Sequence, residues 1–196
     1  MSRTVGSHGP STLAAIHEAG LQLIYEHGYE AMTLRQLARQ VGLQAGSLYN
    51  HIETKQQLLF DLIHNHMIHL MEKLDEALEG AENPDDALRR FIAFHLIYHI
   101  EKKREVFIGS SEIRSLEPEN QEKIVTQRRA YEDRLCAILD AGVEAEIFKI
   151  GDSRISTYAI LAMLTGICTW YDPAGRVTQD ELIKIHTALL IDGVSH

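Results

Sequence analysis

The sequence is poor in residues that interrupt regular structure, because only 4 prolines and 13 glycines occur among its 196 residues. It also lacks low-complexity runs and any apolar run of the roughly 18–20 residues that a membrane span requires. Its N-terminus lacks the charged-then-apolar pattern of a signal peptide. These absences predict a cytoplasmic protein of one or two domains, with no membrane partner.

Cysteine is scarce as well. Cys136 and Cys168 both lie in apolar helical patterns and lack the spacing of metal ligands. We therefore expect two buried free thiols in a reducing compartment, and no cofactor. The sequences HExxH, GxSxG, GxGxxG and the P-loop are absent too, so we do not expect an enzyme.

Helical periodicity dominates what is present, and no stretch alternates apolar and polar residues as a half-buried strand would. Start and stop signals divide the chain into about nine helices, which predicts an all-α fold. The clearest start signals are three capping boxes and one Asn-Pro pair: Thr33 with Gln36, Thr54 with Gln57, Thr178 with Glu181, and Asn83 with Pro84.

Two short helices joined by a glycine turn are predicted around Gly42. Residues 33–41 form a helix whose inner face carries apolar side chains, and Gly42 follows where a left-handed residue ends a helix. Leu48 and Ile52 would pack the next helix back on the first, and the small Ala38 allows close approach. This pattern predicts a helix-turn-helix. The alternative is an ordinary helical hairpin with a glycine turn.

The outer side of the second helix is polar and narrow. Ala45 and Gly46 make its leading end slim enough for the backbone to sit deep in a DNA major groove about 12 Å wide. Gln44 and Asn50 can pair with base edges or phosphates. Side chains that suit phosphate oxygens follow at Ser47, Tyr49 and His51.

Residues 12–60 resemble the DNA-binding domain of the TetR family of bacterial regulators. The resemblance rests on "LAAIHEAGLQLIYEHGYEAMT", "TLRQLARQVGL" and "GSLYNHIETKQQLL". It implies that bases face Gln44, Ala45, Gly46 and Asn50, and that phosphates are held by Thr33, Tyr49, His51 and Lys55. Gln44 stands where the family usually has serine or threonine, and glutamine caps a helix poorly, so we expect it to contact a base instead.

Charge is distributed unevenly along the chain. Residues 1–60 contain four basic and four acidic side chains: Arg3, Arg35, Arg39 and Lys55 against Glu18, Glu26, Glu30 and Glu53. This part is therefore neutral, and the whole net charge of -9 lies beyond residue 60. We expect weak nonspecific DNA affinity and place Arg35 in the DNA-binding set. The predicted domains are residues 10–56 for DNA binding and 57–196 for effector binding and dimerisation.

Aromatic and polar side chains in the C-terminal part suit either a plain core or the wall of an effector cavity. We expect the segment around Gly109 to break into a short helix or turn. His95 and His99 share a helix face, but no cysteine or carboxylate completes a metal set, so no metal is expected. The predicted effector-binding residues are Phe94, His95, Tyr98, Ser111, Arg114 and Trp170.

Residues 154–171 are apolar nearly all round, as in a helix buried on more than one side. In the TetR family the final two helices form a two-fold four-helix interface, so the resemblance implies a homodimer. A monomer that uses both helices in its core is the alternative. The predicted dimerisation residues are Ser156, Ala159, Gly166, Leu182, Ile185 and Leu189.

The resemblance as a whole implies a one-component transcriptional repressor that a small hydrophobic effector releases from a palindromic operator. The segments "TWYDPAGRVTQDEL" and "EVFIGSSEIRSLEPEN" resemble those of members controlling lipid or acyl-CoA degradation, which proposes an acyl-CoA or related metabolite. The alternatives are a drug-responsive efflux regulator and a helical adaptor that binds only proteins.

Overall fold

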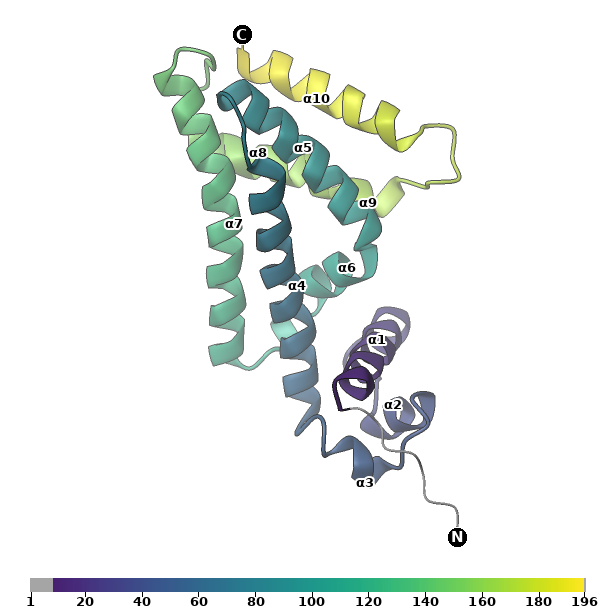
Figure 1. The fold of residues 1–196 in the computed structure, drawn as a ribbon. Coiled ribbons are helices and arrows are strands. Elements are labelled where there is room, and N and C mark those ends of the chain that lie inside the picture. Colours follow the sequence, from purple (N-terminus) through teal and green to yellow (C-terminus); the bar gives the residue numbers. More distant parts are fainter. Residues whose placement is uncertain (1–8, 196) are drawn as a thin grey trace. The chain divides into compact units, whose positions relative to one another are not determined.

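The computed structural model describes residues 9–195, and these contain only helices and their connections (Figure 1). The elements are α1 (Gly9–His27), α2 (Leu34–Gln40), α3 (Ala45–Leu48), α4 (Lys55–Leu78), α5 (Pro84–Glu101), α6 (Lys103–Ser111), the 3-10 helix η1 (Ile113–Ser115), α7 (Pro118–Glu144), α8 (Ser153–Thr165), α9 (Ile167–Trp170) and α10 (Gln179–Ser195). The all-α prediction is confirmed. The expected helix over residues 152–171 is divided at Gly166 into α8 and α9. Among the described residues, no helix has the length and hydropathy of a membrane span.

Most predicted helix starts have the expected caps. The Thr33 box is complete, because its hydroxyl accepts from the N–H of Gln36 and the Gln36 side chain accepts from the N–H of Thr33. The box before α4 is only half formed. The Thr54 hydroxyl accepts from the N–H of Gln57 at 3.0 Å, but the Gln57 side chain accepts from the N–H of Glu53 instead. Side-chain caps therefore fix where these helices begin.

The short helix predicted around Gly109 is present. Helix α6 has 9 residues and runs through Gly109 to Ser111, and the chain turns at η1. Gly109 is buried beside Ile108, which is 1% exposed in the core. Burial of these neighbours outweighs the roughly 1 kcal/mol that a glycine costs inside a helix.

The described chain forms two compact units that are not continuous in sequence. Unit 1 comprises residues 9–66 and Arg104–Ile124, and unit 2 comprises Met67–Lys103 and residues 125–195. Helices α4 and α7 each contribute residues to both units. Each unit has its own apolar core.

The core of unit 1 is built mainly by α1, α2, α3 and the first half of α4. Its fully buried side chains include Ile24 of α1, Leu37 of α2 and Leu48 of α3. The later segment returns to this core through Ile108 and Leu116. The helix-turn-helix is thus held in place by residues distant in sequence.

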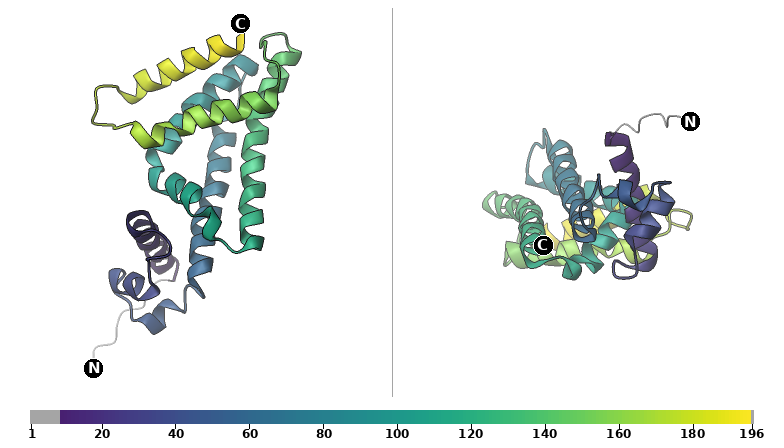
Figure 2. Two further views of the ribbon diagram at one scale, coloured as in Figure 1. Left: turned by 180° about the vertical axis from the view of Figure 1, so that it is seen from behind. Right: turned by 90° about the horizontal axis from the view of Figure 1, so that it is seen from below.

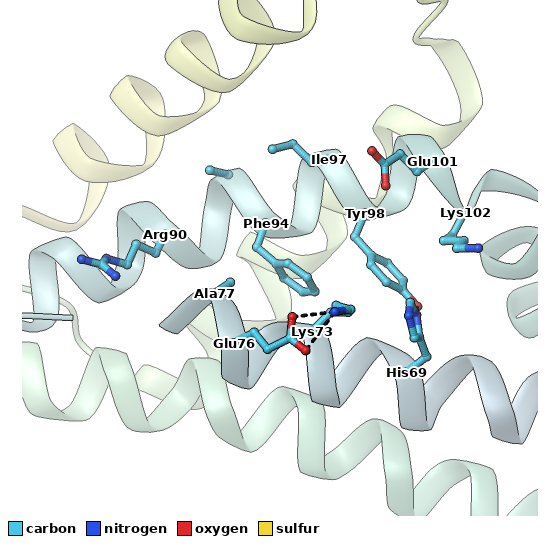
Figure 3. Close-up of a pocket in the computed structure, with 11 residues that line it drawn as sticks. His69, Lys73, Glu76, Ala77, Arg90, Phe94, Ile97, Tyr98, Glu101 and Lys102 are labelled. Atoms are coloured by element: carbon cyan, nitrogen blue, oxygen red, sulfur yellow. Dashed lines mark hydrogen bonds and ion pairs between the residues drawn. The ribbon is translucent and has the colours of Figure 1, made fainter. Parts of the chain in front are cut away.

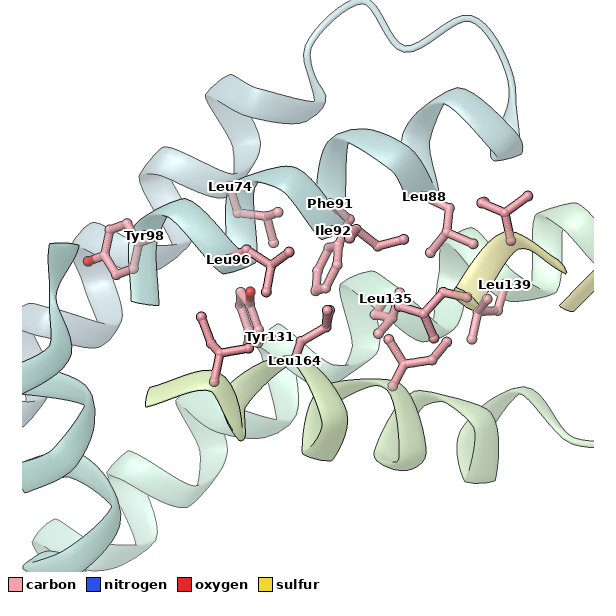
Figure 4. Packing of buried hydrophobic residues seen from close by; sticks show 14 of the residues in the cluster. Leu74, Leu88, Phe91, Ile92, Leu96, Tyr98, Tyr131, Leu135, Leu139 and Leu164 are labelled. Carbon is pink, nitrogen blue, oxygen red and sulfur yellow. The ribbon is translucent and has the colours of Figure 1, made fainter. Parts of the chain in front are cut away.

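Helix α5 is central in unit 2, where it packs against α8, α9 and α10. Phe91 of α5 is fully buried in a cluster with Leu135 of α7 and Leu164 of α8 (Figure 4). Helix α8 lies behind α5 in Figure 1 and in front of it in the reversed view of Figure 2. This packing leaves one side of α8 and one side of α10 uncovered, as the exposure of their side chains shows.

Candidate nucleic-acid interface and ligand groove

The turn between α2 and α3 depends on Gly42. Its φ of 69° lies in the left-handed region, which glycine adopts without steric cost. The turn is closed by backbone hydrogen bonds from Gly42 to Arg39 at 3.2 Å and from Leu43 to Ala38 at 2.8 Å. These bonds set the direction in which α3 leaves α2.

Helix α3 is shorter than the sequence indicates. It has 4 residues, and beyond it the chain continues in a turn in which the N–H of His51 donates to Leu48 at 2.9 Å. Gln44 occupies the N-cap position without a side-chain cap hydrogen bond. Gly46 and Asn50 are weak helix formers, so the missing cap and the local propensity together explain the short helix. Tyr49 and Asn50 consequently lie beyond the α-helical turn.

The outward side of this segment is exposed and leaves open space in front of it. Tyr49 is 55% exposed, whereas Leu48 beside it is fully buried. A Cβ atom added to Gly46 would meet no heavy atom within 4 Å. Gly46 is therefore not required by packing inside the protein. Exposed side chains share this surface with two half-buried ones: Gln44, Ala45 and Asn50 are exposed, and Ser47 and His51 are half-buried.

A cleft of about 600 Å³ lies beside α3 in unit 1, and it is lined by Glu30, Met32, Thr33, Leu34, Arg35, Ala45, Tyr49 and Lys55. Within the described residues, Arg35 is exposed and forms no ion pair. The Thr33 hydroxyl is held by Gln36, to whose side-chain oxygen it donates at 2.8 Å. The cleft thus carries two cations against the single carboxylate of Glu30.

Lys55 is already fixed on one side. Its ammonium donates to the carbonyl of Glu30 at 3.1 Å and lies 4.2 Å from the ring centroid of Tyr29. An ammonium has three donors, so the remaining N–H groups are available to an anion in the cleft. This position has a structural role as well as a binding capacity.

Phe94 and Tyr98 line a groove of about 590 Å³ between α4 and α5 in unit 2 (Figure 3). The Tyr98 hydroxyl is 2.9 Å from Nδ1 of His69 on α4. Sequence reasoning missed the residues that α4 supplies: His69, Lys73, Glu76 and Ala77. The positions His69, Lys73 and Ala77 repeat every fourth residue and so share one helix face, which is the signal that the sequence offered.

His95 points to the opposite side of α5 and is buried. Its Nδ1 lies 2.9 Å from the Tyr131 hydroxyl, and its Nε2 lies 3.1 Å from the Thr165 hydroxyl. The His95 ring stacks on His99 with centroids 3.6 Å apart. The pKa of His95 lies well below its ordinary value, chiefly because burial disfavours the charged ring and to a lesser degree because of repulsion by the neighbouring His99. His95 is therefore a neutral core group with both ring nitrogens hydrogen-bonded.

The remaining predicted effector residues lie elsewhere. Ser111 ends α6 and Arg114 belongs to η1, so both are part of unit 1, and both are exposed. Trp170 is 58% exposed and stacks on His186 with centroids 6.4 Å apart. Of the six predicted residues, the structure brings Phe94 and Tyr98 together on the groove.

Large apolar side chains are exposed on α8 and α10. They include the predicted Ile185 and Leu189, with exposed fractions of 50% and 61%. Sequence reasoning missed three others on α8: Ile155, Tyr158 and Met163. Among the other predicted dimerisation residues, Ala159 is exposed, Ser156 and Gly166 are half-buried, and Leu182 is a core residue at 2% exposure.

Two family profiles match this chain. Residues 16–62 match "Bacterial regulatory proteins, tetR family", and residues 81–194 match "Tetracyclin repressor-like, C-terminal domain". The chain is 24% identical over 194 residues to the HTH-type transcriptional repressor KstR2 of Mycolicibacterium smegmatis, covering 95% of this chain and 94% of that protein.

Solved structures agree with these matches. PfmR, a TetR family transcriptional regulator from Thermus thermophilus, superposes with a TM-score of 0.82 at 32% identity, over 92% of this chain and 99% of PfmR. AibR in complex with isovaleryl coenzyme A and operator DNA superposes with a TM-score of 0.85 at 24% identity, over 92% of this chain and 98% of AibR. The chain therefore belongs to the TetR family and is a helix-turn-helix transcriptional regulator.

Proposed function

We propose that this regulator is a repressor that binds a palindromic operator as a homodimer and is released by a small hydrophobic effector. The observation that carries the proposal is the exposed surface around α3, where Gly46 faces empty space beside a cleft that contains Arg35 and Lys55. An uncovered glycine next to cations suits close approach to a DNA backbone. The relative KstR2 is a transcriptional repressor, which supports repression rather than activation here.

The proposed DNA contacts divide into two groups. The residues that face bases are Gln44, Ala45, Gly46 and Asn50, and those that hold phosphates are Thr33, Arg35, Ser47, Tyr49, His51 and Lys55. Because the first sixty residues are neutral, binding depends on two copies of this surface rather than on a strong positive field. A dimer would contact half-sites about 34–36 Å apart, one helical turn of DNA.

Dimerisation is proposed to occur through the uncovered sides of α8 and α10. Ile155, Tyr158, Ile185 and Leu189 are each at least half exposed in the single chain, with fractions from 50% to 67%. Covering apolar surface contributes about 25 cal/mol per Å². A closed two-fold pair is the commonest way for one chain to cover such a surface. Residues 57–196 are accordingly proposed to hold both dimerisation and effector binding.

The effector is proposed to bind in unit 2, in the groove that Phe94 and Tyr98 line. Its volume of about 590 Å³ falls within the range of small-molecule sites, about 300–1,000 Å³. AibR was solved with an acyl-coenzyme A, which supports an acyl-CoA or related metabolite as the class of effector here. A coupling of about 1–3 kcal/mol would weaken operator binding roughly 5- to 150-fold.

We also infer that the protein has no catalytic role and acts in the cytoplasm, where operator DNA is located. The matches to transcriptional-regulator profiles over residues 16–62 and 81–194 support this inference.

Footprinting on the DNA upstream of the protein's own gene tests the proposal. The full chain should protect two half-sites and sediment as a dimer. Ile185→Glu with Leu189→Glu should give a monomer that loses protection, whereas Ile68→Glu, at a 40% exposed residue of α4, should change neither. Protection by a monomer, or a dimer that protects no DNA upstream, would contradict the proposal.

A further inference from the structure

The groove between α4 and α5 has chemically different parts. Its apolar lining combines the short side chains of Ala77 and Ala93, one from each helix, with the larger Phe94 and Ile97 of α5. The charged groups that line it are Lys73, Arg90 and Lys102 against Glu76 and Glu101. Arg90 is paired with Asp86, so Lys73 and Lys102 are the cations that an anionic ligand in the groove would meet.

Arg90 closes one end of the groove and is occupied there. Its Nε donates to Asp86 at 3.0 Å, Nη1 donates to the carbonyl of Glu79 at 2.8 Å and Nη2 donates to that of Gly80 at 3.3 Å. The guanidinium therefore satisfies the C-terminal end of α4. About 18 Å of helix separates Arg90 from Lys102, at about 1.5 Å per residue. The apolar lining between these ends is elongated.

Hydrogen-bonding groups line the rest of the groove. In Figure 3, His69 and Tyr98 meet toward the Lys102 end, and Lys73 lies beside Glu76 below Phe94. Lys73 pairs with Glu76 at 2.6 Å, but both side chains are exposed, at 44% and 62%. Such surface pairs are weak, so an incoming anion can take the place of the carboxylate. A Tyr98 hydroxyl that donates to Nδ1 of His69 leaves the ring proton on Nε2 as a further donor.

We propose that the groove binds an elongated apolar molecule that ends in an anionic group, with the apolar body on Phe94 and Ile97 and the anion at Lys73 and Lys102. This inference rests on the proposed effector function and specifies its chemistry. A carboxylate and a phosphate are both compatible with the donors. Because Arg90 is already paired at its end of the groove, the anion is placed toward Lys102, which sets the orientation of the ligand.

Calorimetric titration of the full-length protein with decanoate, decyl phosphate and decanol tests the anion. Both anions should bind more tightly than the alcohol, by about two- to fivefold, because an exposed charge pair changes affinity by up to roughly fivefold. The comparison of decanoate with decyl phosphate distinguishes the two head groups. The preference for anions should shrink at high salt.

Matched variants locate the site. Lys73→Gln with Lys102→Gln should remove the preference for anions and leave decanol binding unchanged. The control pair is Lys123→Gln with Lys149→Gln, because Lys123 also forms an exposed ion pair, with Glu119, and neither lysine lines the groove. Ala93→Phe should fill the groove and weaken all three ligands at least tenfold, whereas Ala137→Phe, at an exposed position of α7, should not.

Equal affinity for decanoate and decanol would overturn the anionic class, and unchanged binding to Ala93→Phe would overturn the groove as the site. Footprinting in the presence of each ligand separates this inference from the proposed function. Decanoate that binds the groove without releasing the operator would leave the groove chemistry standing and contradict its role as the effector site.

Discussion

The helix-turn-helix of unit 1 and the core of unit 2 use similar polar side chains in opposite ways. Around α3, Tyr49 is 55% exposed, whereas Leu48 beside it is buried. In unit 2, the hydroxyls of Tyr131 and Thr165 hydrogen-bond both nitrogens of the buried His95. The exposed Tyr49 is accessible to DNA, whereas the hydrogen-bonding groups of His95 are already used inside the protein. Residue type alone therefore does not identify a binding site, and the environment of each side chain decides.

Two glycines in helices, Gly46 and Gly142, differ in the same way between the two units. An added Cβ at Gly46 in unit 1 would meet nothing within 4 Å, whereas one at Gly142 in unit 2 would overlap the ring of Phe148. Phe148 is 2% exposed, so its ring has no open space to move into. Packing inside the protein requires glycine at position 142. It does not require glycine at position 46, where we expect an external partner to need the space.

The largest effect is expected for Gly142→Ala. The overlap should force the Phe148 ring from the core, at a cost near that of a Phe→Ala change, about 3–5 kcal/mol. Alanine regains about 1 kcal/mol of helix propensity, which leaves a net loss of about 2–4 kcal/mol. Thermal unfolding followed by circular dichroism measures it. A variant as stable as the wild type would show that the α7–α8 connection repacks easily.

Gly46→Ala should have the reverse profile. Stability should be unchanged or up to about 1 kcal/mol higher, because alanine is the better helix former and no atom is displaced. Operator affinity should fall roughly tenfold, which corresponds to about 1.4 kcal/mol, because the methyl group occupies space needed by base edges. A gel-shift titration beside a thermal melt checks both. Wild-type operator affinity would place the bases away from Gly46.

Local signals in the sequence were sufficient to predict the helix-turn-helix of unit 1. The Thr33 box and Gly42 are set by residues a few positions apart, and both have the predicted conformation. The return of Ile108 and Leu116 to the same core is a long-range contact that no spacing rule contains. For that reason the sequence could not indicate that residues 104–124 belong with the DNA-binding helices.

The groove between α4 and α5 was only half predictable. Phe94 and Tyr98 stood out because aromatics on an apolar helix are conspicuous, but Ala77 and Ala93 contribute by being small. The sequence does not show which small side chains leave a groove open on the surface. His95 has the same spacing signal as Tyr98 and lies on the buried side of α5, because helix rotation follows from packing against α7 and α8.

The buried histidine should make unit 2 sensitive to acid. Because the folded pKa of His95 is depressed, its contribution to stability is complete above the unfolded pKa of about 6.5 and is lost as pH falls below that value. One proton gives a slope of at most about 1.4 kcal/mol per pH unit. The groups that face His95 are His99, Tyr131 and Thr165, none of which supplies a compensating negative charge.

Urea unfolding of the wild type and of His95→Gln between pH 7.5 and pH 5 measures this slope, at roughly half-unit steps. The variant should be less stable at neutral pH and should depend less on pH. His27→Gln is the control, because His27 is about half exposed and lies in unit 1. Parallel pH profiles for the wild type and His95→Gln would show that another group takes up the proton.

The smallest effects are expected at Lys55 and Arg35, the cations proposed to hold phosphates. Lys55→Ala should weaken operator binding about equally across sequences and lower the salt slope by about one per subunit, since it removes one cation from a phosphate. It should also lose about 0.5–1 kcal/mol of stability, because the ammonium lies over the Tyr29 ring and donates to Glu30.

Arg35→Ala is the matched control. Arg35 is exposed, so the same change in salt slope should occur there without the loss of stability. Gel-shift titrations at several salt concentrations, beside thermal melts, separate the two roles. A Lys55→Ala protein that loses stability but keeps the wild-type slope would show that this lysine only fixes the start of α4, and that the cleft binds phosphate through Arg35 alone.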